Sequence, residues 1–239
     1  MTFDLDGPLR DLMQQRLAQT KWDPTTLHVS DLSVCPRSVW ARRNGKTSRP
    51  ITLESFLLRE MGKRYEHTLC RAFEAAGIAY EYQKYFEVTL FGVDISGTAT
   101  FVLPEHNAVL DVHGTSFPSS WVGRGADKHK SVRIPTTPRF GYRVTSAAYA
   151  LALGMEHYGV HTYCRSTGLH ATSWYAATDI VTEVGRALAE RAETAPGTPE
   201  DTSALPPVYT YSHDGISRQC QGCFYYACEN NTNTEKETP

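Results

Sequence analysis

CQGCFYYAC (residues 220–228) ends the part of this chain that is expected to fold, and HVSDLSVCPR (residues 28–37) lies almost two hundred residues upstream. The first segment contains Cys220, Cys223 and Cys228 at spacings of x2 and x4, and the second contains Cys35. Four thiolates can hold one metal centre, and a C-x2-C pair lets two sulfurs reach the same ion from one tight turn. Such a centre would join the two ends of the chain and restrict the fold between them.

Length and composition predict one large domain. The 239 residues are 41% hydrophobic, which is enough for a sizeable core. We assign residues 1–229 to this domain and residues 230–239, which have no apolar side chain, to a disordered tail. Neither an apolar leader nor a membrane-length apolar run is present, so a cytoplasmic protein is expected. In that reducing compartment Cys70 and Cys164, which lack cysteine neighbours, are interpreted as core residues.

Charge is distributed unevenly although the formal net charge is only -2. Residues 31–72 contain nine basic and four acidic side chains, and residues 124–143 form a second basic stretch. A solvated surface would explain both stretches, but interleaved aromatic residues such as Trp40 and Trp121 also favour a nucleic-acid contact. The candidate DNA-binding residues are Arg37, Arg42, Arg43, Lys63, Arg64, Lys128 and Lys130.

Periodicity predicts an α/β chain. Helices are expected at 8–20, 30–43, 53–76, 140–153 and 178–193, and strands at 80–90, 93–103, 107–113, 157–165 and 169–175. The helix over 53–76 has an apolar residue at every fourth position and Gly77 as its expected C-terminal cap. Residues 114–138 are too long for an ordinary connection and are interpreted as a functional loop or a disordered segment, and 194–207 as a linker.

This order of elements between split cysteines resembles the iron-sulfur RecB-like exonucleases of the PD-(D/E)XK nuclease superfamily, which include CRISPR adaptation exonucleases and phage-borne relatives. The resemblance implies a restriction-endonuclease-like core, with a mixed sheet flanked by helices and a 4Fe-4S cluster on the four cysteines. It also implies DNA ends or single strands as substrate, Mg²⁺ or Mn²⁺ as cofactor, and a CRISPR adaptation, repair or phage replication system as context. The x4 spacing is shorter than is common in the family, which leaves the cluster type open.

The family's first and second motifs map onto the helix and strand expected at 53–76 and 93–103. Gly62 and Glu66 match the helical Gly-x3-Glu motif, and His67 is a second candidate metal ligand beside Glu66. In the second motif Thr100 stands where the family has a metal-binding aspartate. A neutral hydroxyl is a poor ligand for a hard dication, so this position is degraded.

The third and fourth motifs are also altered. Asp111 keeps the expected carboxylate, but His113 replaces the family's lysine, and both side chains share one strand face. His113 could bind a metal ion or act as a base, but it lacks the reach and permanent charge of lysine. Thr145 occupies the position of the family's glutamine, four residues before Tyr149.

Three readings follow from these motifs. In the first, Glu66 and Asp111 hold Mg²⁺ or Mn²⁺, with His113 and Tyr149 assisting, in a DNA exonuclease whose activity is weak or lost. In the second, the same fold is a catalytically inactive module that binds DNA or docks on a partner. In the third, the four cysteines hold Zn²⁺ in a structural protein, and a brown, anaerobically purified protein would exclude zinc as the sole occupant.

Overall fold

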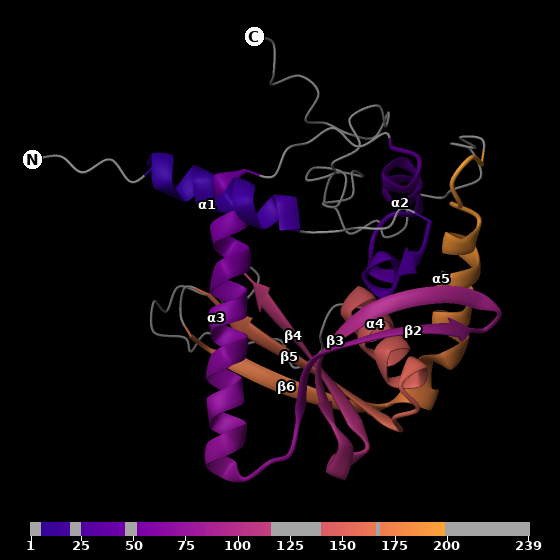
Figure 1. Ribbon diagram of the computed structural model, residues 1–239. Coiled ribbons are helices and arrows are strands. Elements are labelled where there is room, and N and C mark those ends of the chain that lie inside the picture. The colour runs from indigo at the N-terminus through magenta and orange to yellow at the C-terminus, as the bar shows by residue number, and fades with distance from the viewer. Residues whose placement is uncertain (1–5, 20–24, 46–51, 116–139, 166–167, 199–239) are drawn as a thin grey trace, which may run out of the picture.

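The computed structural model describes residues 6–19, 25–45, 52–115, 140–165 and 168–198. Two helices come first, α1 (Asp6–Gln19) and, after the short strand β1 (Leu27–His28) and a 3-10 turn (Val29–Ser33), α2 (Pro36–Arg43). The long helix α3 (Leu53–Ala76) leads into strands β2 (Glu81–Leu90), β3 (Val93–Leu103) and β4 (Ala108–Thr115). Helix α4 (Phe140–Ala152), strands β5 (His157–Cys164) and β6 (His170–Ala176) and helix α5 (Val181–Ala192) follow (Figure 1).

The strands form one mixed sheet in the order β1-β3-β4-β5-β6, with β2 paired to β3. Strands β2, β3 and β4 are antiparallel neighbours, β4 and β5 are parallel, and β6 returns antiparallel to β5. The parallel β4–β5 pair requires a crossover, and the chain between them includes α4. The predicted α/β class with a mixed sheet between helices is confirmed.

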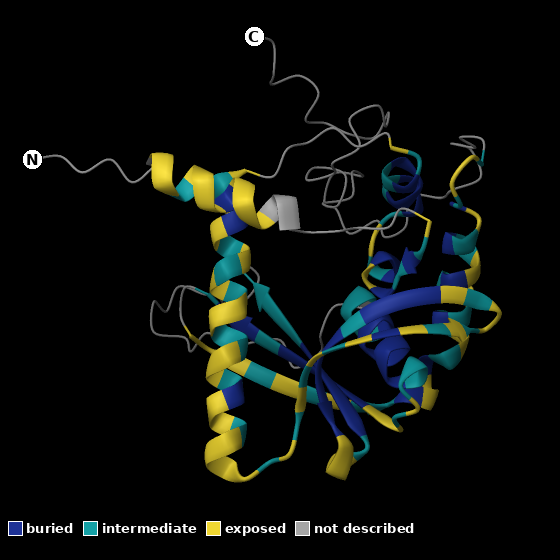
Figure 2. Ribbon diagram, viewed as in Figure 1, coloured by how far each residue is buried: buried dark blue, intermediate teal, exposed yellow. Residues whose placement is uncertain are grey.

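Helices lie on both faces of the sheet. On one face α4 packs against β5 and the 3-10 turn, with α5 beside it, around a core that includes Ile95, Val109, Tyr158 and Leu188. On the other face α3 contributes Cys70 to a smaller core with Phe101 and other residues of β3 and β4. Figure 2 shows the buried residues concentrated between the sheet and α4, whereas α3 is largely exposed or intermediate.

The ends of α3 follow the sequence signals. Thr52 precedes the helix and its hydroxyl accepts a hydrogen bond from the Ser55 backbone N–H. Gly77 ends it in the left-handed conformation at φ 67°, which glycine adopts without a Cβ penalty. The prediction over 53–76 is therefore confirmed at both ends.

The predicted helix over 30–43 is wrong in one respect, because it is split. A 3-10 turn ends at Ser33, and α2 begins only at Pro36, which occupies the first helical position where its missing N–H costs nothing. Cys35 is the residue that precedes α2 and has an extended-type ψ of 131°. Restriction of the residue before a proline explains why the helix could not run through this point.

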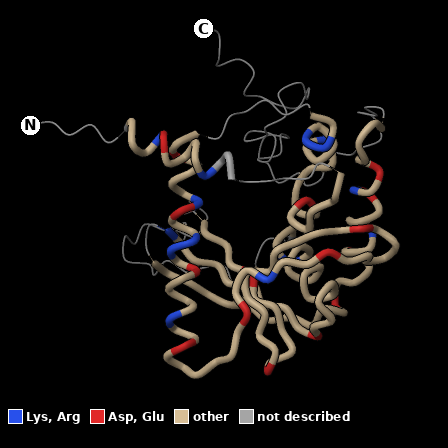
Figure 3. Tube along the Cα trace, viewed as in Figure 1, with Lys and Arg blue, Asp and Glu red and all other residues tan. Residues whose placement is uncertain are grey.

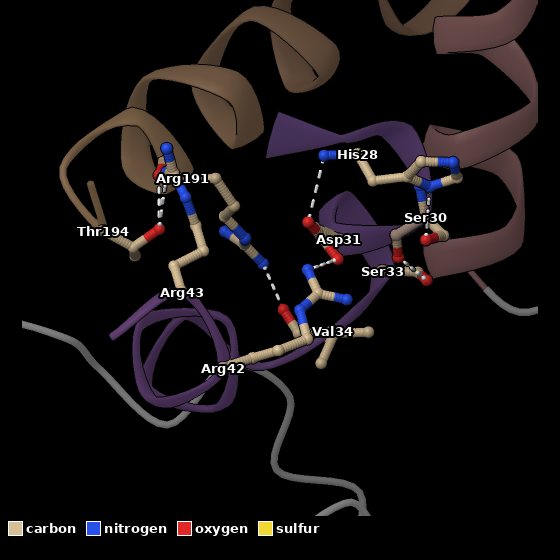
Figure 4. Close-up of polar contacts among 9 residues, drawn as sticks. All are labelled: His28, Ser30, Asp31, Ser33, Val34, Arg42, Arg43, Arg191 and Thr194. Carbon is tan, nitrogen blue, oxygen red and sulfur yellow. Dashed lines mark hydrogen bonds and ion pairs between the residues drawn. The ribbon is translucent and has the colours of Figure 1, made fainter. Parts of the chain in front are cut away.

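Buried charges join this split segment to α5 (Figure 4). Asp31 pairs with Arg42, and its carboxylate also accepts a 3.1 Å hydrogen bond from the His28 backbone N–H. Arg191 of α5 donates to the carbonyl oxygen of Val34 at 2.8 Å, and Arg43 donates to the Arg191 carbonyl oxygen at 3.3 Å. These contacts fix the segment that contains Cys35 against the last helix.

No helix in the described part of the chain combines the length and the apolar character that crossing a membrane would require.

Candidate functional site

Thr100 and Asp111 lie side by side on neighbouring strands. Phe101 of β3 pairs with Leu110 of β4, and the Thr100 hydroxyl donates a 2.9 Å hydrogen bond to Asp111 Oδ1. The second and third motif positions therefore meet in space, as the resemblance implies.

The Asp111 carboxylate is enclosed by donors from the protein itself. Oδ1 also accepts from the Val112 backbone N–H at 3.1 Å. Oδ2 accepts from the Ser146 hydroxyl of α4 at 3.2 Å and lies 3.0 Å from His113 Nε2. Each oxygen thus has two partners, and Asp111 is only 6% exposed. A carboxylate offers about four acceptor positions, so little capacity remains for a metal ion.

The pKa of Asp111 lies below its ordinary value. Burial by itself would raise this pKa, but the charge and hydrogen bond of His113 and the hydroxyls of Thr100 and Ser146 outweigh it. Asp111 is therefore a carboxylate at neutral pH, held by hydrogen bonds to its charged form.

Acid should remove this stabilisation. A carboxyl group whose pKa is lower in the folded than in the unfolded chain adds stability above its unfolded pKa of about 4, and this is lost as the pH falls further. We expect the native chain to exceed Asp111→Asn in free energy of unfolding at pH 6 to 7, and the difference to shrink below about pH 4. Urea unfolding across this range measures it. The exposed Asp94→Asn serves as control, and a difference that stays constant with pH would contradict the prediction.

His113 is held in place by an aromatic neighbour. Its ring stacks on Tyr142 of α4 with centroids 3.8 Å apart and planes inclined by 5°. With Nε2 beside Asp111 and one face covered by Tyr142, the imidazole points into the protein. The family's lysine would instead project a mobile ammonium group.

The other α4 positions serve the helix and the core. The Thr145 hydroxyl donates to the Gly141 carbonyl oxygen of its own helix at 3.0 Å. Tyr149 is 5% exposed and meets the Phe86 ring edge-on at 6.0 Å between centroids, and burial raises the pKa of its hydroxyl. Ser146, which the motif comparison did not single out, is the α4 residue that reaches Asp111.

Glu66 faces a different space from Asp111. Its Oε2 accepts hydrogen bonds from the Tyr82 hydroxyl and from Gln83 Nε2, both at 2.9 Å. Burial raises the pKa of Glu66, the two hydrogen bonds oppose this, and the negative charge of Asp111 adds to the rise. His67 is exposed, with its ring 5.4 Å from that of Tyr82.

A groove of about 490 Å³ lies between α3 and the ends of β4 and β5. Glu66 lines it, together with Val112 and Gly114 of β4. Successive side chains of a strand point to opposite faces, so Asp111 and His113 lie behind this wall. Within the described residues no group of three or more His, Cys, Asp and Glu side chains could hold a metal ion. Asp111 has little acceptor capacity left and Glu66 lines the groove on the other side of β4, so these two carboxylates do not present a joint site for the divalent metal ion of the implied exonuclease.

Only part of the predicted cationic set faces solvent. Lys63 and Arg64 are exposed on α3, along which basic and acidic positions alternate (Figure 3). Arg37 and Arg43 are buried, and Arg42 pairs with Asp31, so these three present little charge to solvent. Lys128 and Lys130 lie outside the described residues. Arg59 belongs to the basic stretch 31–72 but was not among the candidate DNA-binding residues, and Arg165 was not singled out; both line the groove beside Lys63.

Of the four predicted cluster ligands only Cys35 is described; Cys220, Cys223 and Cys228 lie outside the described residues. Cys35 is half-buried at the start of α2. The indole N–H of Trp40 in the same helix donates to the Thr198 carbonyl oxygen at 3.1 Å, so the chain leaves the described part beside α2. Cys70 and Cys164 are buried, which confirms them as core residues.

Searches against family models and curated proteins find no match. Among solved structures, the crystal structure of a protein designated SSO0001 superposes with a TM-score of 0.60 at 14% identity, covering 96% of this chain and 98% of that one. An alkaline exonuclease from Laribacter hongkongensis superposes with a TM-score of 0.42 at 12% identity, covering 71% of this chain and 90% of that one. A provisionally named exonuclease from Eubacterium rectale superposes with a TM-score of 0.45 at 12% identity, covering 80% of this chain and 84% of that one. The first superposition shows that this chain shares its fold with SSO0001 over nearly its whole length.

Proposed function

We propose that this chain is a nucleic-acid-directed protein on a PD-(D/E)XK nuclease scaffold, in which metal-dependent phosphodiester hydrolysis is weak or lost. The observation that carries the proposal is the enclosure of Asp111 by Thr100, Ser146 and His113. Thr100 stands where the resemblance places an acidic ligand, and it donates a hydrogen bond to the remaining carboxylate. The motif positions thus keep their spatial relationship, while their chemistry has changed from metal ligation to internal hydrogen bonding.

A nucleic-acid partner is supported by the groove beside this cluster. Arg59, Lys63 and Arg165 bring three cationic side chains to its lining, against one acid, Glu66. Phosphate groups are held by such cations without any need for hydrolysis. The sequence contains a second basic stretch at residues 124–143.

The alternative is a weak Mg²⁺- or Mn²⁺-dependent exonuclease that uses Glu66 and Asp111. It is favoured by one observation: the negative charge of Asp111 adds to the rise in the pKa of Glu66. Against it, Oε2 of Glu66 and both oxygens of Asp111 already accept hydrogen bonds from the protein.

The proposal includes a cluster on Cys35, Cys220, Cys223 and Cys228, with 4Fe-4S as the expected type. Its support is the spacing of the cysteines and the departure of the chain beside α2, the helix that Cys35 precedes. Iron and acid-labile sulfide analysis of anaerobically purified protein distinguishes this cluster from zinc.

A cleavage assay on end-labelled single- and double-stranded DNA with Mn²⁺ tests the loss of hydrolysis. We expect the native chain and Asp111→Asn to show the same background level of cleavage. Both should still bind the labelled DNA in a gel-shift assay, more weakly as the salt concentration rises. Cleavage by the native chain that Asp111→Asn abolishes would establish the exonuclease alternative. Absence of DNA binding at low salt would overturn the nucleic-acid role.

A further inference from the structure

A second, larger pocket lies under the C-terminal half of α3. Its volume is about 710 Å³, and it shares no lining residue with the groove that contains Glu66. Leu69 and Phe73 of α3 form one wall, Ala108 and Leu110 of β4 form part of the floor, and β6 supplies the far side. Neither the motif comparison nor the Asp111 cluster involves it.

The lining of this pocket is largely apolar. It contains no Asp, Glu, Lys or Arg, and its polar side chains are Thr172 and four histidines, His106, His157, His161 and His170. His161 bonds to the Tyr65 hydroxyl at 2.9 Å and to the Thr172 hydroxyl at 2.7 Å. Burial, together with the charge of His170, lowers the pKa of His161 to about 4, so this imidazole is neutral at pH 7. Because no carboxylate, ammonium or guanidinium group lines the pocket, the lining fits a flat heterocycle with a few polar atoms.

Trp174 of β6 forms a prepared aromatic wall. It pairs with Gly159 of β5, where an added Cβ would lie 2.7 Å from the indole ring. The missing side chain therefore lets the indole lie against the strand, while half of the residue remains exposed. An exposed indole fixed at the edge of an apolar pocket is a stacking surface for another aromatic ring.

Cations lie along the same helix. Lys63 in the groove and Phe73 in the pocket are ten residues apart on α3, a rise of about 15 Å. The rings of Tyr65 and Tyr163 of β5 stack with their centroids 3.7 Å apart. This stacked pair lies between the two sites. A short single strand could therefore place phosphates near Arg59 and Lys63 and a base against Trp174.

We propose that this pocket binds one base of a single-stranded nucleic acid, stacked on Trp174, while the strand's backbone lies along the Arg59 and Lys63 groove. This inference rests on the proposed nucleic-acid role and specifies its substrate as single-stranded. A duplex keeps its bases paired and stacked, so it cannot insert one without unpairing.

The experiment measures anisotropy of a fluorescein-labelled 12-nucleotide DNA, single-stranded or as a blunt duplex, with the full chain at low salt. Loss of one base–aromatic stack is worth about 1–3 kcal/mol. Trp174→Leu should therefore weaken single-strand binding by roughly 5- to 150-fold and leave duplex binding unchanged. The exposed aromatic Tyr85, which lines neither pocket, provides the control Tyr85→Ser, with no expected change. A scan of abasic positions should find one whose loss weakens the native chain but not Trp174→Leu.

The outcomes separate the two proposals. If the native chain binds neither DNA, the nucleic-acid role fails. Titration of tryptophan fluorescence with adenosine and thymidine, compared between the native chain and Trp174→Leu, then tests the pocket alone. If it binds DNA but Trp174→Leu and every abasic position are without effect, the base pocket is wrong and the role stands. Saturable, Trp174-dependent binding of a free nucleoside without any abasic effect would also overturn the inference, since the base would then not belong to a strand.

Discussion

The double variant Thr100→Asp with His113→Lys is expected to cleave DNA in the presence of Mn²⁺, where the native chain does not. The first change places a carboxylate next to Asp111, and the second returns a mobile cation in place of the imidazole stacked on Tyr142. Two adjacent carboxylates are a suitable pair of oxygen ligands for a hard dication. We expect an increase on the order of 100-fold or more over background, or about 3 kcal/mol of barrier.

Stability supplies a second measurement of the same change. Without metal, the new carboxylate at position 100 repels Asp111 in a site where Thr100 is only 7% exposed, so the melting temperature should fall. Mn²⁺ should restore it, because a ligand that binds only the folded chain stabilises that state. Thr100→Asn with His113→Lys is the control, because it has nearly the same volume but lacks the second charge.

Asp111→Asn added to the double variant must abolish any cleavage that appears. A restored variant that folds and gains stability with Mn²⁺, yet leaves both single- and double-stranded DNA intact, would show that the scaffold does not position a phosphodiester for attack. If the native chain instead cleaves DNA as fast as the double variant, the hydrogen bonds to Asp111 must open readily. Each result assigns the loss to a different cause.

Local patterns predicted local structure well. The four-residue period and Gly77 located α3 to the residue, and the motif comparison placed Thr100 and Asp111 on two strands that the structure pairs. Pro36 also marked the start of α2, a signal that the continuous helix prediction over 30–43 overlooked. These features depend on backbone geometry within a few residues or on the pairing of adjacent strands.

The chemistry of the site depended on contacts that no spacing contains. Whether Ser146 or Thr145 reaches Asp111 is decided by the rotation of α4 on the sheet, which long-range packing sets. The separation of Glu66 from Asp111 follows from α3 covering the opposite face of β4. A motif comparison places such residues on the right elements but cannot give the direction of their side chains.

Loss of Arg191 should have the largest effect on stability among the polar side chains of the core. This arginine of α5 is 1% exposed. It donates to the Val34 carbonyl oxygen at 2.8 Å (Figure 4) and to the Leu32 carbonyl oxygen at 3.4 Å. Arg191→Met keeps most of the volume but leaves both carbonyl groups without these donors. A buried hydrogen bond to a charged group is worth about 1.5–3 kcal/mol, and the 3.4 Å contact is longer than usual and adds less, so we expect a loss of roughly 2–4 kcal/mol. For a chain of this size that is a fall of roughly 5 to 15 °C in melting temperature.

The matched control is Arg186→Met, on the exposed side of the same helix, which should change the melting temperature little. Because Val34 directly precedes Cys35, amide exchange should rise first across residues 28–43 and not in β4 or β5. If a cluster on Cys35 depends on this anchoring, iron per chain should fall in Arg191→Met and stay unchanged in Arg186→Met. Equal losses in the two variants would mean that α5 does not hold the cysteine segment, and that the N-terminal elements reach the C-terminal cysteines by another route.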